Sequence, residues 1–322
     1  MLALLGMPPA AFAYSHVVVV IIENRDYTDI IGDKAAPCIN GVLAREGAVL
    51  TNSIALSRPS QPNYLQLFSG SPQTVARSNG PVPGSLAPAG APPTGAGLDT
   101  PNLGAAVRHA GGSYIGYSES LSLAPDPLAY QAGGRSGELY ARKHNPGSNW
   151  VATSPRGDQL PASTNQDFSR FKATPFDSLP TLAFVIPNQC NDAHGADPDC
   201  PYAQPDANTA LADTWLRTHI QPYAEWATAH DSLLILTADE GNTDIGVDSE
   251  TRQKLSRVPT VIVGAGISPG SSYAGRVDHY GVCAFIAGAV GAKPPGRCAS
   301  PESQAQAADL ARALGARLSA VR

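Results

Sequence analysis

The chain has 322 residues, of which 43% are hydrophobic and 15% are charged, and its formal net charge is −5 at pH 7. A chain of this length and composition can bury a full core and is typical of a soluble globular protein. No apolar run approaches the ~20 residues that a membrane-spanning helix needs. The acidic balance argues against a general nucleic-acid binder and a polybasic membrane anchor. We therefore expect no transmembrane segment and no nucleic-acid partner.

The first 13 residues have the apolar stretch of a secretory signal and end in Ala11-Phe12-Ala13, an Ala-x-Ala pattern of the kind cleaved on export. The positively charged start of such a signal is missing. We predict a signal remnant over residues 1–13, a single domain over residues 14–322, and a secreted or cell-envelope location.

Five cysteines agree with export. Cys190 and Cys200 flank a short polar loop, and Cys283 and Cys298 lie close in sequence, so the spacing is compatible with two local disulfides. Cys38 is left over. A zinc ribbon is excluded because no Cys-x-x-Cys pair is present.

Strands and helices are predicted to alternate along the chain. Apolar, mostly β-branched runs predict strands at residues 16–22, 48–54, 113–117, 181–186, 232–237 and 258–263. Helices are predicted at residues 36–46, 61–69, 102–110 and 207–220, and from Ser300 onward with Leu310, Leu314 and Leu318 in one apolar stripe. Two segments, at about 71–101 and 121–177, are expected to be irregular insertions. This alternation predicts an α/β domain with a mainly parallel sheet.

Ser60 directly precedes the helix predicted at residues 61–69, which has Pro62 in its first turn and stops at Gly70. Ser60 is therefore the expected N-cap. A capping serine usually bonds back to the free N–H groups of its helix, but those groups can also hold a phosphate against the serine oxygen. This stretch alone favours a structural cap over a nucleophile.

Polar side chains follow three of the predicted strands at their carboxyl ends. They are Glu23 and Asn24, then Asp192 and His194, then Asp239 and Glu240. Ligands of open parallel sheets bind at this edge. Oxygen ligands suit hard divalent ions such as Mg²⁺, Ca²⁺ or Mn²⁺, while nearby imidazoles would admit Zn²⁺ or Fe.

Five ordered pieces of the sequence carry a family resemblance. They are Glu23-Asn24, Arg58-Pro-Ser-Gln-Pro-Asn-Tyr64 with Phe68-Ser-Gly70, Tyr140-Ala-Arg-Lys-His-Asn-Pro146, Ile186-Pro-Asn-Gln-Cys-Asn-Asp-Ala-His194 and Asp239-Glu240. Together they resemble the phosphoesterase family of bacterial secreted acid phosphatases and phospholipase C-type enzymes, within the alkaline phosphatase superfamily. The resemblance spans about residues 16–286. It implies a three-layer α/β/α sandwich with a mainly parallel central sheet and an irregular insertion over the active site.

The resemblance also implies a function and a set of site residues. We expect a secreted, metal-dependent phosphatase that hydrolyses phosphate monoesters through a phosphoserine at Ser60, acting as an acid phosphatase or on phosphatidylinositol phosphates. The Ser60-Gln-Pro-Asn63 piece is similar to the Thr-x-Pro-Asn motif of nucleotide pyrophosphatases, which selects Ser60 over Ser57 or Ser53. The expected ligands of at least one divalent metal ion are Glu23, Asn24, Asp239 and Glu240. Further catalytic groups are His144, His194 and His279, as donors to the phosphate, leaving-group acids or ligands of a second metal ion. The expected substrate-binding residues are Arg58, Asn63, Lys143 and Asp192.

Energetics make the metal necessary to this hypothesis. A helix N-terminus supplies only ~0.3–1 kcal/mol, against the more than ~20 kcal/mol of barrier lowering that phosphate monoester hydrolysis requires. The chain departs from the family pattern at Arg25, where the family usually has His, and in the loop at residues 195–202. The alternatives are a phospholipase C-type phosphodiesterase acting on phospholipid head groups and, in another class, a non-catalytic exported binding module.

Overall fold

The computed structural model describes residues 12–75, 77–80, 82–85, 97–123, 139–195, 200, 205–249 and 252–319. Most of the expected signal remnant, residues 1–11, therefore lies outside the described residues. None of the described helices is both long and apolar enough to cross a membrane.

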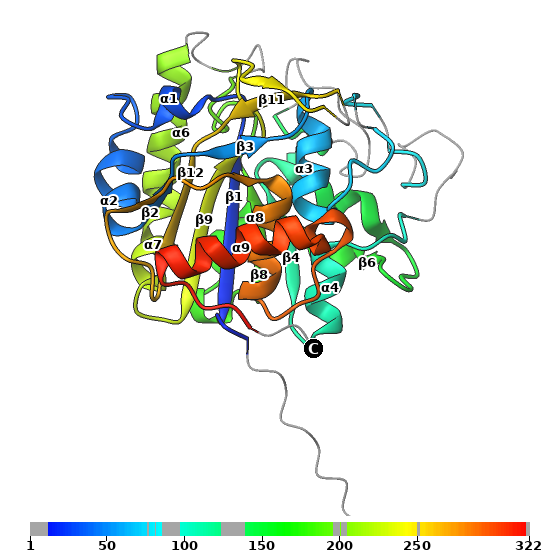
Figure 1. Cartoon of the computed structure of the whole chain (residues 1–322). Coiled ribbons are helices and arrows are strands. Elements are labelled where there is room, and N and C mark those ends of the chain that lie inside the picture. The colour runs from blue at the N-terminus through cyan, green and yellow to red at the C-terminus, as the bar shows by residue number, and fades with distance from the viewer. Residues whose placement is uncertain are drawn as a thin grey trace, which may run out of the picture.

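An eight-stranded sheet runs through the middle of the molecule (Figure 1). In spatial order its strands are β13 (Ser271–Tyr273), β2 (Ala48–Leu50), β12 (Thr260–Gly264), β9 (Ser232–Ala238), β1 (His16–Ile22), β8 (Leu182–Ile186), β4 (Tyr114–Ser118) and β7 (Asn165–Asp167). The five strands from β9 to β7 are parallel, whereas β12 pairs antiparallel with both β9 and β2. The predicted mainly parallel sheet is confirmed.

The central strand β1 is buried on both faces. Val17, Val19 and Ile21 point into one apolar core, and the alternate residues Val18 and Val20 point into the other. Both faces of this strand are apolar and must be kept from water, so helices are needed on both sides of the sheet.

Both helical layers are present. One comprises α3 (Ser60–Ser69), α4 (Leu103–His109), α8 (His279–Ala289) and α9 (Pro301–Leu314). The other comprises η1 (Ile39–Leu43), α2 (Ala44–Glu46), α5 (Phe168–Ala173), α6 (Pro205–His219) and α7 (Gln221–Ala227). Figure 1 looks onto the layer that contains α8 and α9. The arrangement confirms the three-layer α/β/α sandwich.

Smaller elements surround the carboxyl edge of the main sheet. A second sheet has the order β10 (Gly246–Val247), β11 (Lys254–Arg257), β3 (Ser53–Ala55) and β14 (Val277–Asp278), and a short pair joins β5 (Val151–Ala152) to β6 (Leu160–Pro161). The single helical turns are α1 (Tyr27–Ile30), η2 (Leu121–Leu123), η3 (Arg142–His144), η4 (Pro146–Trp150), η5 (Ala162–Thr164), η6 (Phe176–Ser178) and η7 (Gly296–Ala299).

Three local expectations need correction. The strand predicted at residues 48–54 is two strands, β2 and β3, in different sheets, because a turn at Thr51 and Asn52 separates them. The segment at 121–177 includes β7, which extends the main sheet, and α5, which covers it. Leu318 follows α9 instead of continuing its stripe, although it still packs against the core.

The cysteines pair as the sequence spacing allowed. Disulfides join Cys190 to Cys200 and Cys283 to Cys298, and Cys38 is a buried free thiol. The first disulfide encloses the loop that follows β8, and the second ties α8 to η7.

Candidate active site

The pairing of β1 with its neighbours brings three strand ends together. Ile22 pairs with Ala238, so Glu23 and Asp239 leave their strands at the same level. The Glu23 amide donates to the Asp192 carbonyl at 2.6 Å, and the Asp239 amide donates to the Ile22 carbonyl at 3.1 Å. Acidic groups more than 200 residues apart in sequence thus meet at one edge of the sheet.

Asn24 links these strand ends through a left-handed backbone, with φ 44°. Asparagine adopts this region more readily than most residues. The turn lets the Asn24 amide donate to Asp239 Oδ1 at 3.1 Å and its side-chain Nδ2 donate to Glu23 Oε2 at 3.0 Å. Nδ2 also lies 3.5 Å from Ser60 Oγ and 3.5 Å from His194 Nδ1.

Ser60 is buried at the start of α3, and its hydroxyl points into the acidic cluster. Its Oγ donates to Glu240 Oε1 at 3.1 Å and lies 3.4 Å from Glu23 Oε2. The predicted N-cap is wrong by one residue, because Pro59 is the residue before the helix and Ser60 is its first helical residue. The Ser60 oxygen is therefore free of a capping role.

Asn63 holds the segment that leads into α3. Its Oδ1 accepts from the amides of Leu56 and Ser57, at 3.2 and 3.0 Å, and its Nδ2 donates to the Ser57 carbonyl at 2.8 Å. Asn63 is fully buried, with its amide committed to the backbone. It was expected to bind substrate, but its side-chain amide is bonded to the backbone of the segment that precedes Ser60.

The insertion expected to lie over the site contributes η3. His144 Nε2 lies 2.8 Å from Glu23 Oε1, and His144 Nδ1 lies 3.9 Å from Asp192 Oδ2. Lys143 is buried beside it, and the positive charge of Lys143 acts on both Glu23 and Glu240.

Several buried ligand atoms of the site lack a hydrogen-bond partner within the described structure. They are Glu23 Oε1, His144 Nε2, Asp192 Oδ2, Asp239 Oδ2 and Glu240 Oε2. Ligand atoms of Glu23, His144 and Asp192 all lie within 4.8 Å of one another. Each such buried group costs about 1–3 kcal/mol when unpaired, and a divalent cation between Glu23, His144 and Asp192 would pair the atoms of these three. The donor set fits a metal ion, with four carboxylates and one imidazole.

The expected ligand Glu23 therefore meets His144 and Asp192. His144 was expected to contact the phosphate or to bind a second metal ion, and Asp192 was expected to bind substrate; both join Glu23 in the cluster of ligand atoms. Asp239 and Glu240 present their free oxygens next to Ser60 and Asn24.

The other two expected catalytic histidines differ in their surroundings. His194 is 38% exposed, and its Nδ1 lies 3.4 Å from Glu23 Oε2. The bond to Glu23 raises its pKa against the opposing effect of burial. His279 is fully buried, its Nε2 lies 2.6 Å from the Asp239 carbonyl, and burial lowers its pKa. His279 thus holds the backbone of Asp239, which makes it a positioning residue.

Two arginines flank the cluster. Arg58 Nε lies 3.0 Å from Asp244 Oδ1, and its charge also acts on Glu240. Arg25 is buried and donates to the Ala193 carbonyl. This contact gives the unusual Arg25 a role in holding the loop between Asp192 and His194.

The four carboxyl groups of the site lie close enough to interact, and their pKa values are shifted in different directions. Burial and the charge of Glu23 raise the pKa of Asp192 to about 7 and that of Glu240 to about 7. Burial, Glu23 and Glu240 raise the pKa of Asp239 well above its ordinary value. Burial would raise the pKa of Glu23 too, but His144, His194 and Lys143 outweigh it and hold this pKa well below the usual range.

Glu119 supports the site but was not identified from the sequence. Its carboxylate accepts from the Asn188 amide at 2.9 Å, from Asn191 Nδ2 at 3.0 Å and from Trp215 Nε1 at 3.0 Å. These bonds anchor the turn that precedes Asp192. Its place after β4, at the same edge of the sheet, is the signal that could have identified it.

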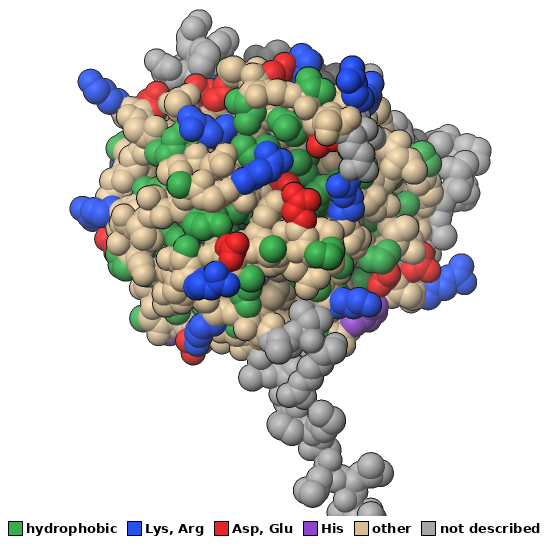
Figure 2. Space-filling view, in the orientation of Figure 1, with side chains coloured by type: hydrophobic (Ala, Val, Ile, Leu, Met, Phe, Trp, Pro, Cys, Tyr) green, Lys and Arg blue, Asp and Glu red, His purple; other side chains and the backbone are tan. Residues whose placement is uncertain are grey.

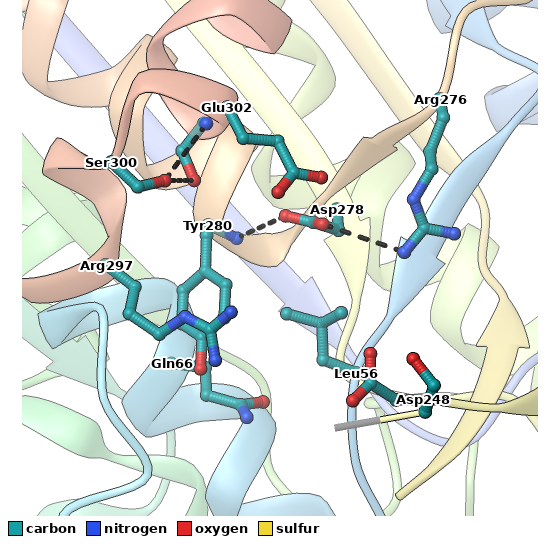
Figure 3. A pocket seen from close by; sticks show the side chains of 11 residues that line it. Leu56, Gln66, Asp248, Arg276, Asp278, Tyr280, Arg297, Ser300 and Glu302 are labelled. Atoms are coloured by element: carbon teal, nitrogen blue, oxygen red, sulfur yellow. Dashed lines mark hydrogen bonds and ion pairs between the residues drawn. The ribbon is translucent and has the colours of Figure 1, made fainter. Parts of the chain in front are cut away.

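A separate cavity of about 150 Å³ opens on the face that α8 and α9 cover (Figure 3). None of the expected site residues lines it. Its walls carry both signs of charge, and the Arg297 guanidinium lies 5.0 Å from the centre of the Tyr280 ring. Figure 2 shows basic and acidic side chains interspersed over the same face, without a broad patch of one sign.

Comparison with known proteins decides the family. Residues 34–291 match the model of the Phosphoesterase family. The chain belongs to this family. It is 35% identical to a phosphatidylinositol-3-phosphatase of Mycobacterium tuberculosis, over 85% of this chain and 76% of that protein. It is 29% identical to a phosphate-repressible acid phosphatase of Penicillium chrysogenum over 72% of this chain, and spans about half (49%) of that fungal protein.

The fold is that of the alkaline phosphatase superfamily. A Vibrio parahaemolyticus protein of this superfamily superposes with a TM-score of 0.56 at 12% identity, covering 92% of this chain and 73% of that one. The lipoteichoic acid synthase LtaP of Listeria monocytogenes superposes with a TM-score of 0.53 at 10% identity, covering 89% and 77%. Family membership and the phosphatase relatives identify the chain as a phosphoric ester hydrolase.

The loop disulfide predicts a site-specific effect. Replacing Cys190 and Cys200 by Ser should lower the rate of phosphate release from p-nitrophenyl phosphate ~10-fold or more, because Asp192 and His194 lie within the loop it closes. The matched control replaces Cys283 and Cys298, whose disulfide closes a loop of similar length and should cost similar stability, ~3 kcal/mol. Both rates are measured at a temperature where both variants are folded. Equal loss in the two variants would contradict a special role for the loop.

The raised pKa values predict how stability depends on pH without metal. Asp192 and Glu240 have folded pKa values of about 7, above the ~4 of unfolded carboxyls. The folded state therefore binds more protons between these values, and the free energy of unfolding falls as pH rises through this window. Thermal unfolding in a chelator should give a lower midpoint at pH 8 than at pH 5, and Glu240→Gln should reduce the difference. Asp309→Asn, on the exposed side of α9, is the control; a higher midpoint at pH 8 would refute the prediction.

Proposed function

We propose that the chain is a metal-dependent phosphatase that hydrolyses phosphate monoesters through a phosphoserine at Ser60. The observation that carries this proposal is the position of Ser60 Oγ, 3.1 Å from Glu240 Oε1, among buried ligand atoms that lack partners. A serine used only for structure has no need of this acidic surrounding. The non-catalytic binding module is disfavoured because nucleophile and ligand groups are all in place.

Glu23, His144 and Asp192 would hold the metal ion, with Asn24, Asp239 and Glu240 beside them. When bound, the ion supplies a positive charge that polarises the phosphoryl oxygens and favours the serine alkoxide. The positioning contacts of Glu119, Arg25 and His279 keep this ligand set in place. Outer contacts of this kind tune metal sites by ~10–100-fold.

Ser60 attacks phosphorus, and Glu240 takes its proton. The Ser60 hydroxyl already donates to Glu240 Oε1, so this carboxylate is placed to accept the proton. The bond from Ser60 Oγ to phosphorus forms as the bond from phosphorus to the leaving oxygen breaks. The first turn of α3 offers few amides to phosphate, since Gln61 donates to Asn79 Oδ1 and Pro62 has none. Lys143 would supply the additional positive charge.

His194 is suited to protonate the leaving oxygen. Of the three expected catalytic histidines it is the partly exposed one, so it borders the space from which substrate enters. The bond to Glu23 raises its pKa, which favours the protonated form that an acid needs. After the alcohol leaves, the neutral His194 accepts a proton from the attacking water. The water oxygen bonds to phosphorus, the Ser60 bond breaks, and Glu240 returns the proton to Ser60.

A phosphoinositide monoester is the proposed substrate class, and an exported location is proposed with it. The relative from Mycobacterium tuberculosis is named a phosphatidylinositol-3-phosphatase, and it is 35% identical over 85% of this chain. Two disulfides support an oxidising compartment. Comparing hydrolysis of phosphatidylinositol 3-phosphate with that of phosphatidylcholine separates the monoesterase from the phospholipase C-type alternative.

Ser60→Ala tests the proposed nucleophile. We expect the rate of phosphate release to fall ~10³-fold or more, because the covalent route is lost. Wild-type protein quenched in acid during turnover should carry phosphate on Ser60, detected by mass spectrometry, and lose activity in a chelator until Mg²⁺ or Mn²⁺ is restored.

The matched control is Ser69→Ala. Ser69 is a buried serine of the same helix whose Oγ donates to the Leu65 carbonyl at 2.7 Å, away from the acidic cluster. It should retain activity. Undiminished turnover in a folded Ser60→Ala variant, or activity that no chelator affects, would overturn the corresponding part of the proposal.

A further inference from the structure

Tyr64 lies on α3 one helical turn after Ser60, on the same face of the helix. Its ring stacks on the His144 imidazole, with centroids 5.2 Å apart and planes 13° from parallel. The side chain is 1% exposed. Tyr64 is therefore packed against a residue of the ligand cluster from the helix that carries Ser60.

The Tyr64 hydroxyl is buried and has no hydrogen-bond partner within the described structure. Burial raises its pKa, and the charges of Glu23, Asp239 and Asp192 raise it further, so the hydroxyl is a neutral O–H donor beside carboxylates. Glu23 Oε1 is likewise buried, and it lies 2.8 Å from His144 Nε2. A buried donor without an acceptor destabilises the folded state, so its retention next to this cluster calls for a reason.

Tyr114 shows what a purely packed tyrosine looks like here. Its hydroxyl is also buried without a partner within the described residues, but its ring packs among Phe68 and Phe184 in the apolar core. Burial alone raises its pKa, with no carboxylate contributing. The two tyrosines match in burial and differ in their charged surroundings, so Tyr114 serves as a control.

We propose that Tyr64 is a positioning residue of the metal site. Its ring fixes the plane of His144, and its hydroxyl donates to Glu23, so that Glu23 Oε1 and His144 Nε2, 2.8 Å apart, are directed at one position. Glu23 and His144, with Asp192, are the residues whose ligand atoms lie within 4.8 Å of one another. The inference rests on the proposed function and adds to it a residue that touches neither substrate nor the reacting atoms.

Three variants test this role with two measurements. The first is the affinity for Mn²⁺, obtained from the concentration of free Mn²⁺ by electron paramagnetic resonance. The second is kcat and KM for p-nitrophenyl phosphate. Tyr64→Phe keeps the ring and removes the hydroxyl; we expect ~10-fold weaker Mn²⁺ binding and ~10-fold lower kcat, with KM little changed. Tyr64→Leu removes both contacts and should lose more. Tyr114→Phe should match the wild type. Wild-type values in Tyr64→Phe, or equal losses in Tyr114→Phe, would overturn the inference.

A crystal structure of Tyr64→Leu separates this inference from the proposed function. If the inference holds, the His144 ring turns away from Glu23; a ring that keeps its wild-type place overturns it. Wild-type protein that neither binds Mn²⁺ nor releases phosphate would overturn the proposed function, and the orientation of His144 would still decide the role of Tyr64.

Discussion

Pairing of β1 between β9 and β8 is the constraint on which the rest of the site depends. Ile22 pairs with Ala238, which sets Glu23 level with Asp239. The Asp192 carbonyl accepts a hydrogen bond from the Glu23 amide. A one-residue slip would turn every side chain of the strand to the other face. Because β1 is apolar on both faces, polarity alone does not exclude such a slip; the packing of the two cores and the amide bonds of Glu23 and Asp239 hold the register, and with it the spacing of the carboxylates.

Stability and chemistry conflict at this edge of the sheet. Four carboxylates lie together where burial disfavours charge. His144, His194 and Lys143 hold the pKa of Glu23 low, while the pKa values of the other three carboxyls are raised. Buried oxygens without partners are costly in a folded chain unless a positive charge arrives. Function supplies the reason for an arrangement that packing alone would not select.

Much of this could be read from the sequence, for identifiable reasons. The unbroken β-branched run of β1 revealed a central strand, and acids at strand ends pointed to the edge where ligands bind. The sequence could not show what Asn63 does, because its bonds to Leu56 and Ser57 depend on a turn that no sequence pattern predicts. The same holds for His279 and His144: a motif names a histidine, but only tertiary packing decides whether it meets a carbonyl or a carboxylate.

The bonds of Asn63 have a consequence for how Ser60 is placed. Ser60 follows a turn held by contacts within eight residues of sequence, from Leu56 to Asn63, whereas the acids that surround it come from separate strand ends. A change in the register of the main sheet would therefore move the acids relative to the serine and leave the turn before the serine intact.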